Sequence, residues 1–130
     1  MAVAIKISTR GRSEMVDITA LVKKELDNSG KADGMCLVYI PHTTAGVTIN
    51  EGADPDVKSD ILAALSEMVP ATGNYRHAEG NSDSHIKAAL VGSSVVIPIQ
   101  NAKLLLGTWQ SIFFCEFDGP RSRSALIQFI

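Results

Sequence analysis

Apolar and polar residues alternate at the start of the chain, a pattern with a period of two that predicts extended structure. The alternation covers residues 3–9 and, after a short polar turn, resumes over residues 15–19. Two such runs joined by a turn predict an opening β-hairpin. Ile18, Val22 and Leu26 then fall four apart, a spacing that predicts a helix directly after the hairpin.

The middle of the chain switches between strand-like and helix-like patterns. The continuous apolar run at residues 35–40 predicts a strand buried on both faces, and residues 46–51 predict a second extended segment. A helical stripe follows over residues 54–70, with Pro55 in its first turn and Pro70 at its end. Residues 82–92 predict a short third helix that a glycine terminates.

The rest of the sequence has the β-branched and aromatic content of two or three long strands, over residues 93–99, 103–119 and 121–130. No internal repeat or low-complexity linker divides the chain. Strands that flank separated helices predict a single α+β domain over residues 1–130. We expect a largely antiparallel twisted β-sheet or sandwich with helices packed on one side.

Composition and charge narrow the classes of function. The 130 residues are 45% hydrophobic, which is enough to bury a substantial core and argues against disorder. A net charge of −2, spread without long runs of one sign, disfavours nucleic acid as a ligand. No segment has the pattern of a signal peptide or membrane span, so we expect a soluble cytoplasmic protein with no membrane partner. Cys36 and Cys115 lie in apolar runs and are expected to be buried free thiols.

The three histidines occupy positions where a scaffold can hold an imidazole ring. His42 follows a predicted strand, His77 lies in a polar loop, and His85 falls in the first turn of the short helix, where the helix dipole favours a neutral ring. Two interpretations stay open. The three rings share a divalent metal, with zinc as the first choice and nickel, cobalt or manganese as alternatives. Otherwise they are isolated surface or hydrogen-bonded histidines.

Polar and charged residues accompany the histidines in the same segments, and each alone has an ordinary structural role. Together with a free helix N-terminus they predict a site for a phosphorylated or otherwise anionic small molecule. We assign ligand binding to hydroxyl, amide and guanidinium groups, and catalysis to two carboxylates and one further arginine. The ligand-binding candidates are Thr43, Thr44, Asn81, Arg121 and Arg123, and the catalytic candidates are Glu51, Glu79 and Arg76.

Three motifs carry a resemblance to a known family. The stretches "HTTAGVTINEGADPDV", "NYRHAEGNSDSH" and "LLLGTWQSIFFCEFDGPRSR", in this order, resemble the YjbQ family, also called the secondary thiamine-phosphate synthase family. The similarity runs from about Pro41 to the C-terminus. It implies a small α+β domain that forms a homotrimer, with His42, His77 and His85 as ligands of a divalent metal. It also implies weak synthesis of thiamine phosphate from a pyrimidine diphosphate and a thiazole phosphate, with release of pyrophosphate.

Three functions are compatible with these observations, so whether the protein is an enzyme stays open. The first is a metal-dependent protein acting on phosphorylated small molecules, with a weak thiamine-phosphate synthase (transferase) activity. There Arg76 or Arg121 would stabilise the leaving group, and Tyr75 or Trp109 would offer a flat surface to a ring, although core packing is preferred for Trp109. The second is a non-catalytic binding module for an anionic metabolite. The third is a metal-dependent hydrolase with Glu51 or Glu79 as general base.

One position departs from the family pattern. Family members often carry an acidic or amide residue followed by glycine before the "LLLG" run, whereas this chain has Asn101 and Ala102. Alanine tolerates a positive φ poorly, so we expect this turn to be reshaped.

Overall fold

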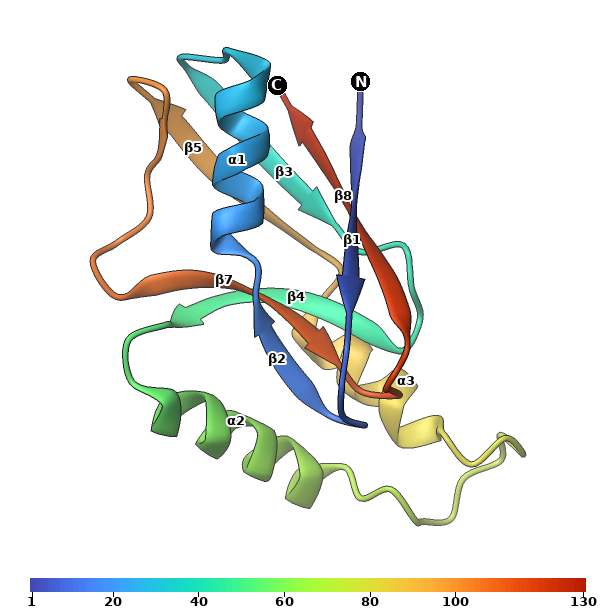
Figure 1. Ribbon diagram of the computed structural model, residues 1–130. Coiled ribbons are helices and arrows are strands. Elements are labelled where there is room, and N and C mark those ends of the chain that lie inside the picture. The colour runs from blue at the N-terminus through green and yellow to red at the C-terminus, as the bar shows by residue number, and fades with distance from the viewer.

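A computed structural model describes all 130 residues and contains eight strands and three helices (Figure 1). The helices lie where the apolar spacing predicts them. In chain order the elements are β1 (Val3–Ser8), β2 (Glu14–Asp17), α1 (Thr19–Ser29), β3 (Gly34–Tyr39), β4 (Ala45–Glu51), α2 (Pro55–Met68), α3 (Ser82–Val91), β5 (Ser94–Gln100), β6 (Lys103–Leu104), β7 (Gln110–Glu116) and β8 (Ser122–Phe129).

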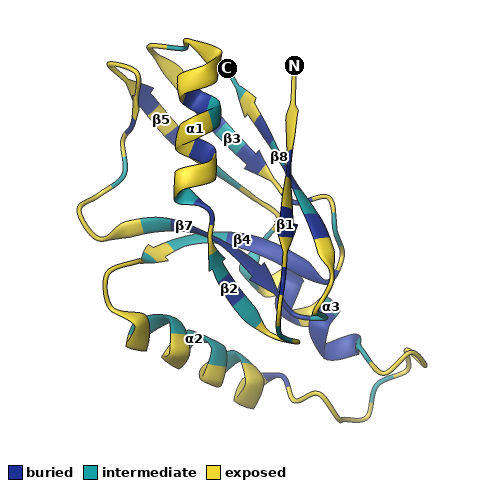
Figure 2. Cartoon of the chain, viewed as in Figure 1, coloured by how far each residue is buried: buried dark blue, intermediate teal, exposed yellow.

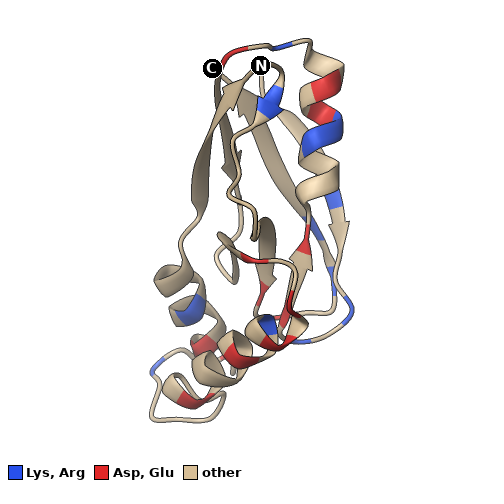
Figure 3. Cartoon of the chain, turned by 90° about the vertical axis from the view of Figure 1, so that its left-hand side faces the viewer, with Lys and Arg blue, Asp and Glu red and all other residues tan.

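The strands form two sheets in which every pair is antiparallel. The larger sheet has the order β1-β8-β3-β5-β6, and the smaller one has the order β2-β7-β4. The predicted α+β domain with a largely antiparallel sandwich is therefore confirmed. No helix is both long enough and apolar enough to cross a membrane. Basic and acidic residues are interspersed along the elements in the view of Figure 3.

The opening hairpin predicted from the alternation does not form. β1 pairs with β8, with Val3 opposite Ile127, whereas β2 pairs with β7 in the other sheet, with Met15 opposite Cys115. The segment between β1 and β2 therefore connects two sheets. Alternation of apolar and polar residues specifies which face of a strand is buried, but it does not specify the partner strand.

The smaller sheet is a middle layer that is buried on both faces. Phe114 of β7 packs into the larger core together with Val22 and Leu26 of α1. The neighbouring residues Phe113 and Cys115 point the other way, into a second core that α2 and α3 cover. Figure 2 shows the outward surfaces of α1 and α2 exposed and the strands between them largely buried. This double burial explains the unbroken apolar run in β7.

The strand β3 is buried on one face only, which corrects the prediction of burial on both. Cys36 and Val38 are fully buried, but Met35 and Tyr39 are 45% and 44% exposed on the outer face of the larger sheet. On the neighbouring strand β5, Val96 is 53% exposed. A continuous apolar run therefore marks an outer sheet face that no helix of this chain covers.

The turn between β5 and β6 keeps a left-handed backbone despite its alanine. Asn101 and Ala102 have φ values of 52° and 61°. Two successive positive φ values are the geometry of the tight hairpin turns that favour Asn-Gly. The amide of Ala102 also donates to the carbonyl of Ala32 at 2.8 Å, which ties the turn to the connection between α1 and β3. Ala102 therefore adopts a positive φ, the conformation that alanine was expected to tolerate poorly.

Candidate functional site

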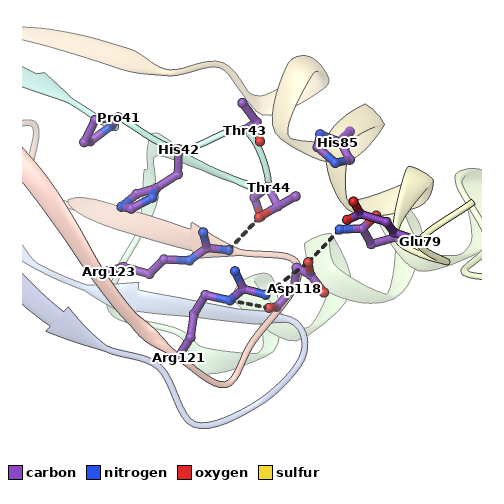
Figure 4. Close-up of a pocket in the computed structure, with 10 residues that line it drawn as sticks. Pro41, His42, Thr43, Thr44, Glu79, His85, Asp118, Arg121 and Arg123 are labelled. Carbon is purple, nitrogen blue, oxygen red and sulfur yellow. Dashed lines mark hydrogen bonds and ion pairs between the residues drawn. The ribbon is translucent and has the colours of Figure 1, made fainter. Parts of the chain in front are cut away.

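A polar cleft with a volume of about 410 Å³ opens where three connections of the chain meet (Figure 4). They are the segment after β3, the loop before α3 and the turn between β7 and β8. No hydrophobic side chain lines this polar cleft. Its lining consists of Pro41, His42, Thr43, Thr44, Glu79, Asn81, His85, Asp118, Arg121 and Arg123.

A buried ion pair between Arg123 and Glu116 supports the wall of the polar cleft. The Nε of Arg123 donates to Glu116 Oε1 at 2.8 Å, and its Nη2 donates both to Glu116 Oε2 and, at 2.8 Å, to the hydroxyl of Thr44. The hydroxyl of Thr9 donates to Glu116 Oε1 at 2.8 Å. Burial alone would raise the pKa of Glu116, but the hydrogen bonds from Arg123, the Asp118 amide and Thr9 outweigh burial and lower it.

The remaining terminal nitrogen of Arg123 is free. Its side chain is almost completely buried, yet Nη1 has no hydrogen-bond partner in the chain and remains accessible to solvent. Arg123 lines the polar cleft, and in Figure 4 one of its terminal nitrogens carries no interaction. A buried guanidinium thus presents an unused donor to this space.

A second arginine lies on the rim. The Nε of Arg121 donates to the carbonyl oxygen of Asp118 at 2.9 Å, and Nη2 lies 3.3 Å from the carboxylate of Asp118, so Nη1 is again without a partner. Asn81 Nδ2 donates to the same carboxylate at 2.9 Å. Because a carboxylate only accepts, this bond fixes the amide orientation and leaves Asn81 Oδ1 buried without a donor.

The three histidines do not meet at one point. His42 Nε2 accepts the Ser124 amide at 3.0 Å, and burial together with the nearby Arg123 lowers the pKa of His42, so its ring is neutral with the proton on Nδ1. His85 lines the same polar cleft. His77 lies in a separate hollow beside His85, where the two rings meet edge to face with centroids 5.3 Å apart.

This arrangement contradicts a metal-dependent function, whereas the assignment of His42, His77 and His85 as metal ligands stays a prediction. No group of three His, Cys, Asp or Glu side chains is placed to hold a metal ion. The Ser124 amide already donates a hydrogen bond to Nε2 of His42. His77 lies outside the polar cleft, with its Nε2 atom 3.7 Å from the Glu79 carboxylate.

Most of the other predicted site residues do line the polar cleft, namely Thr43, Thr44, Glu79, Asn81, Arg121 and Arg123. Two of the catalytic candidates do not. Arg76 lies in the hollow of His77. Glu51 lies at the far end of β4 from Thr44, roughly 20 Å away for a strand of this length, in a hollow beside the start of α2.

The sequence pattern assigned no role to Asp118 or Glu116, although both organise the arginines. A signal for Glu116 exists, because an acidic residue inside the apolar run "IFFCEF" has to be paired when it is buried. The residue that pairs with it could not be read from the pattern.

The N-terminal turn of α3 is anchored by a second buried ion cluster. Asp83 is fully buried, and its two carboxylate oxygens accept from Arg12 Nη1 and Nη2, each at 3.0 Å. Lys87, one turn later and also buried, donates to Asp83 at 2.8 Å. Hydrogen bonding to Arg12, opposed by burial and reinforced by Lys87, lowers the pKa of Asp83 to about 2. This cluster fixes α3, and with it His85, against the connection between β1 and β2.

Known proteins resemble this chain over nearly its whole length. The UPF0047 protein MJ1081 of Methanocaldococcus jannaschii is 53% identical over 125 residues, which cover 96% of this chain and 91% of that protein. The UPF0047 protein YugU of Bacillus subtilis is 49% identical and covers 98% of both chains. A crystal structure of an uncharacterized yjbq/upf0047 family protein from Clostridium acetobutylicum is 55% identical, has a TM-score of 0.97, and covers 98% of this chain and 99% of that chain. These similarities confirm the fold.

The predicted function, a metal-dependent protein with thiamine-phosphate synthase activity, is contradicted by these findings. The two relatives are named as UPF0047 proteins and the solved structure as an uncharacterized protein of that family, and none of these names gives an activity or a metal. No group of three metal-ligating side chains is found in this chain. Neither of the two aromatic residues proposed to stack on a pyrimidine or thiazole ring lines the polar cleft. Trp109 is 63% exposed and lies outside it, and Tyr75 lines the hollow of His77.

The family model described as "UPF0047 protein YjbQ-like" matches residues 3–130. The match includes β1, β2 and α1, which precede the three motifs that carried the resemblance in the sequence. The chain therefore belongs to the YjbQ-like UPF0047 family.

Proposed function

We propose that the polar cleft binds a small anionic molecule, and that a phosphate group is the anion it takes. The observation that carries this proposal is the free Nη1 of Arg123 on a side chain that is otherwise buried and fully hydrogen-bonded. The ion pair with Glu116 uses Nε and Nη2 and holds the guanidinium rigid. A rigid donor whose direction is set by the fold loses little freedom when an anion binds.

The other donors around the polar cleft support an anion with several oxygens. Arg121 has its Nη1 free, and the hydroxyl of Thr43 lies on the same lining. The helix α3 begins at Ser82, and its N-cap residue Asn81 makes no side-chain capping bond, so the first amides of the helix are not capped by a side chain. Uncapped amides and the helix dipole favour negative charge at this end. Tetrahedral phosphate can accept from several such donors at once.

Acidic residues limit which anions fit, because Glu79 and Asp118 line the polar cleft and buried Glu116 pairs with Arg123. Glu116 neutralises part of the charge of Arg123, and Asp118 does the same for Arg121. Binding therefore depends on directed hydrogen bonds more than on a strong positive field. This favours a compact oxyanion on a small molecule over an extended polyanion.

We expect Arg121→Met to weaken the binding of inorganic phosphate by about tenfold, because one hydrogen bond to a charged group is lost. Arg121 is exposed on the rim, so the substitution should leave the fold intact. Isothermal titration calorimetry on the wild type and the variant would measure the change. Arg10→Met is the matched control, since Arg10 is 90% exposed and lies outside the polar cleft. A wild type that does not bind phosphate would overturn the proposed function.

We also propose that the protein assembles as a homo-oligomer, and specifically as a homotrimer. The support is the outer face of the larger sheet, where Met35, Tyr39 and Val96 lie exposed and no helix covers them. Neighbouring strands place these side chains on one surface, because Leu37 between them pairs with Val96. A second copy of the same chain would bury an apolar patch of this kind.

Light scattering at micromolar concentration is expected to give the mass of three chains. Val96→Glu, which places a charge on the proposed contact, should shift the mass toward that of one chain of 13.9 kDa. Leu21→Glu is a matched control, because Leu21 is also exposed but lies on the surface of α1. A wild-type mass of one chain would remove this proposal.

A further inference from the structure

A second groove, with a volume of about 280 Å³, runs along α3 beside the polar cleft. We call it the α3 groove. Three of its residues, His42, Thr43 and His85, also line the polar cleft, so the two spaces adjoin. The others are all small, namely Ala45, Ala88, Ala89, Gly92 and Ser93.

We propose that the ligand of the polar cleft is an organic phosphate monoester whose uncharged part passes between His42 and His85 and lies in the α3 groove. This inference rests on the proposed function, since the phosphate group is placed beside the free Nη1 of Arg123. It adds the second half of the ligand, a short and largely apolar group of a few carbon atoms. The polar cleft alone, without a hydrophobic side chain, would not hold such a group.

The chemistry of the α3 groove differs from that of the polar cleft. It contains no carboxylate and no arginine or lysine, and three of its eight lining residues are alanines, of which Ala89 is exposed. Its two histidines are placed at the junction with the polar cleft, and the ring of His42 is neutral. Apolar surface next to a directed anion site is the usual composition of a small-molecule pocket.

The floor of the α3 groove is rigid because two backbones meet there. A side chain at Gly46 of β4 would come within 2.5 Å of the Gly92 carbonyl oxygen, so only glycine allows this approach. The amide of Val47 donates to the same carbonyl at 3.0 Å. The groove is therefore formed before any ligand arrives.

A third hollow is an alternative place for the uncharged part of the ligand, but the lining residues favour the α3 groove. The hollow of Tyr75, Arg76 and His77 also has a volume of about 280 Å³, yet it shares only His85 with the polar cleft. It also carries an arginine, which an uncharged group would have to desolvate. The α3 groove shares three residues with the polar cleft and carries no such charge.

The test compares inorganic phosphate with n-butyl phosphate by calorimetry. We expect the wild type to bind n-butyl phosphate about tenfold more tightly, because several methylene groups leave water. Ala89→Leu, at an exposed helical position that lines the α3 groove, should abolish this tenfold gain and leave inorganic phosphate binding within about twofold. Ala63→Leu makes the same change at an exposed position of α2 that lines no pocket, and should change neither affinity.

Each outcome has a distinct meaning. Equal affinity of the wild type for both ligands would overturn this inference and leave the phosphate site in place. A gain that persists in Ala89→Leu would place the carbon chain elsewhere and would also overturn it. If the wild type bound neither ligand, the proposed function itself would fail.

Discussion

Arg123→Met is expected to lower the free energy of unfolding by about 3–5 kcal/mol, because it leaves the Glu116 carboxylate buried without its partner. Denaturation with urea at a fixed protein concentration would measure the loss. The loss should shrink as the pH falls. Without Arg123, burial raises the pKa of Glu116, and protonation then removes the buried charge.

A second substitution distinguishes the effect of losing the ion pair from the effect of losing the packing of the Arg123 side chain. Glu116→Gln combined with Arg123→Met removes both charges and keeps an acceptor for Thr9, so the double variant should regain roughly 2 kcal/mol over Arg123→Met. Arg10→Met breaks an exposed pair with Glu14 and should cost less than about 1 kcal/mol. A double variant no more stable than Arg123→Met would show that the ion pair is not the source of the loss.

Asp83→Asn is expected to cost about 3–5 kcal/mol, because it removes the only carboxylate that balances buried Lys87 and also holds Arg12. Lys87→Met should cost clearly less, since Asp83 then keeps its two bonds to Arg12. Asp60→Asn, at an exposed position of α2, is the matched control and should change stability by less than about 0.5 kcal/mol. Equal losses in Asp83→Asn and Lys87→Met would contradict this asymmetry.

The Asp83 carboxylate also makes the free energy of unfolding depend on pH in the acid range. The pKa of Asp83 is about 2 in the folded chain, against 3.8 for the free side chain. A lowered folded pKa stabilises the fold above the unfolded value, and this contribution is lost as the pH falls from about 4 to 2. The contribution is on the order of 2 kcal/mol. It should be absent from the pH profile of Asp83→Asn, which denaturation at several pH values would reveal.

The elements of this fold could be predicted from local pattern, but their partners could not. The spacing of Val22 and Leu26 predicted α1, and Pro55 predicted the start of α2, because both signals lie within a few residues of the feature. The pairing of β1 with β8 depends on residues at opposite ends of the sequence. The predicted hairpin was wrong for this reason, since alternation alone cannot distinguish a local partner from a distant one.

The residue types of the site could be predicted from the sequence, but the hydrogen bonds and contacts between these residues could not. Arg121 and Arg123 were predicted as guanidinium groups that bind an anion, and both do line the polar cleft. The bond from the Ser124 amide to Nε2 of His42 joins segments 82 positions apart, and it sets the orientation of the imidazole ring. No local pattern contains this information. The position of His77 in the neighbouring hollow likewise depends on the course of a long loop.

The strand order of the larger sheet has a consequence for how the protein is made. β8 lies between β1 and β3, and Figure 1 shows the two ends of the chain side by side. A nascent chain therefore carries β1 and β3 with unpaired edges until residues 122–129 leave the ribosome. Pairing over such a distance also makes folding slow, because a long loop must close before its contacts form. Since Arg121 and Arg123 emerge with β8, the capacity to hold an anion would arise only after this strand has left the ribosome.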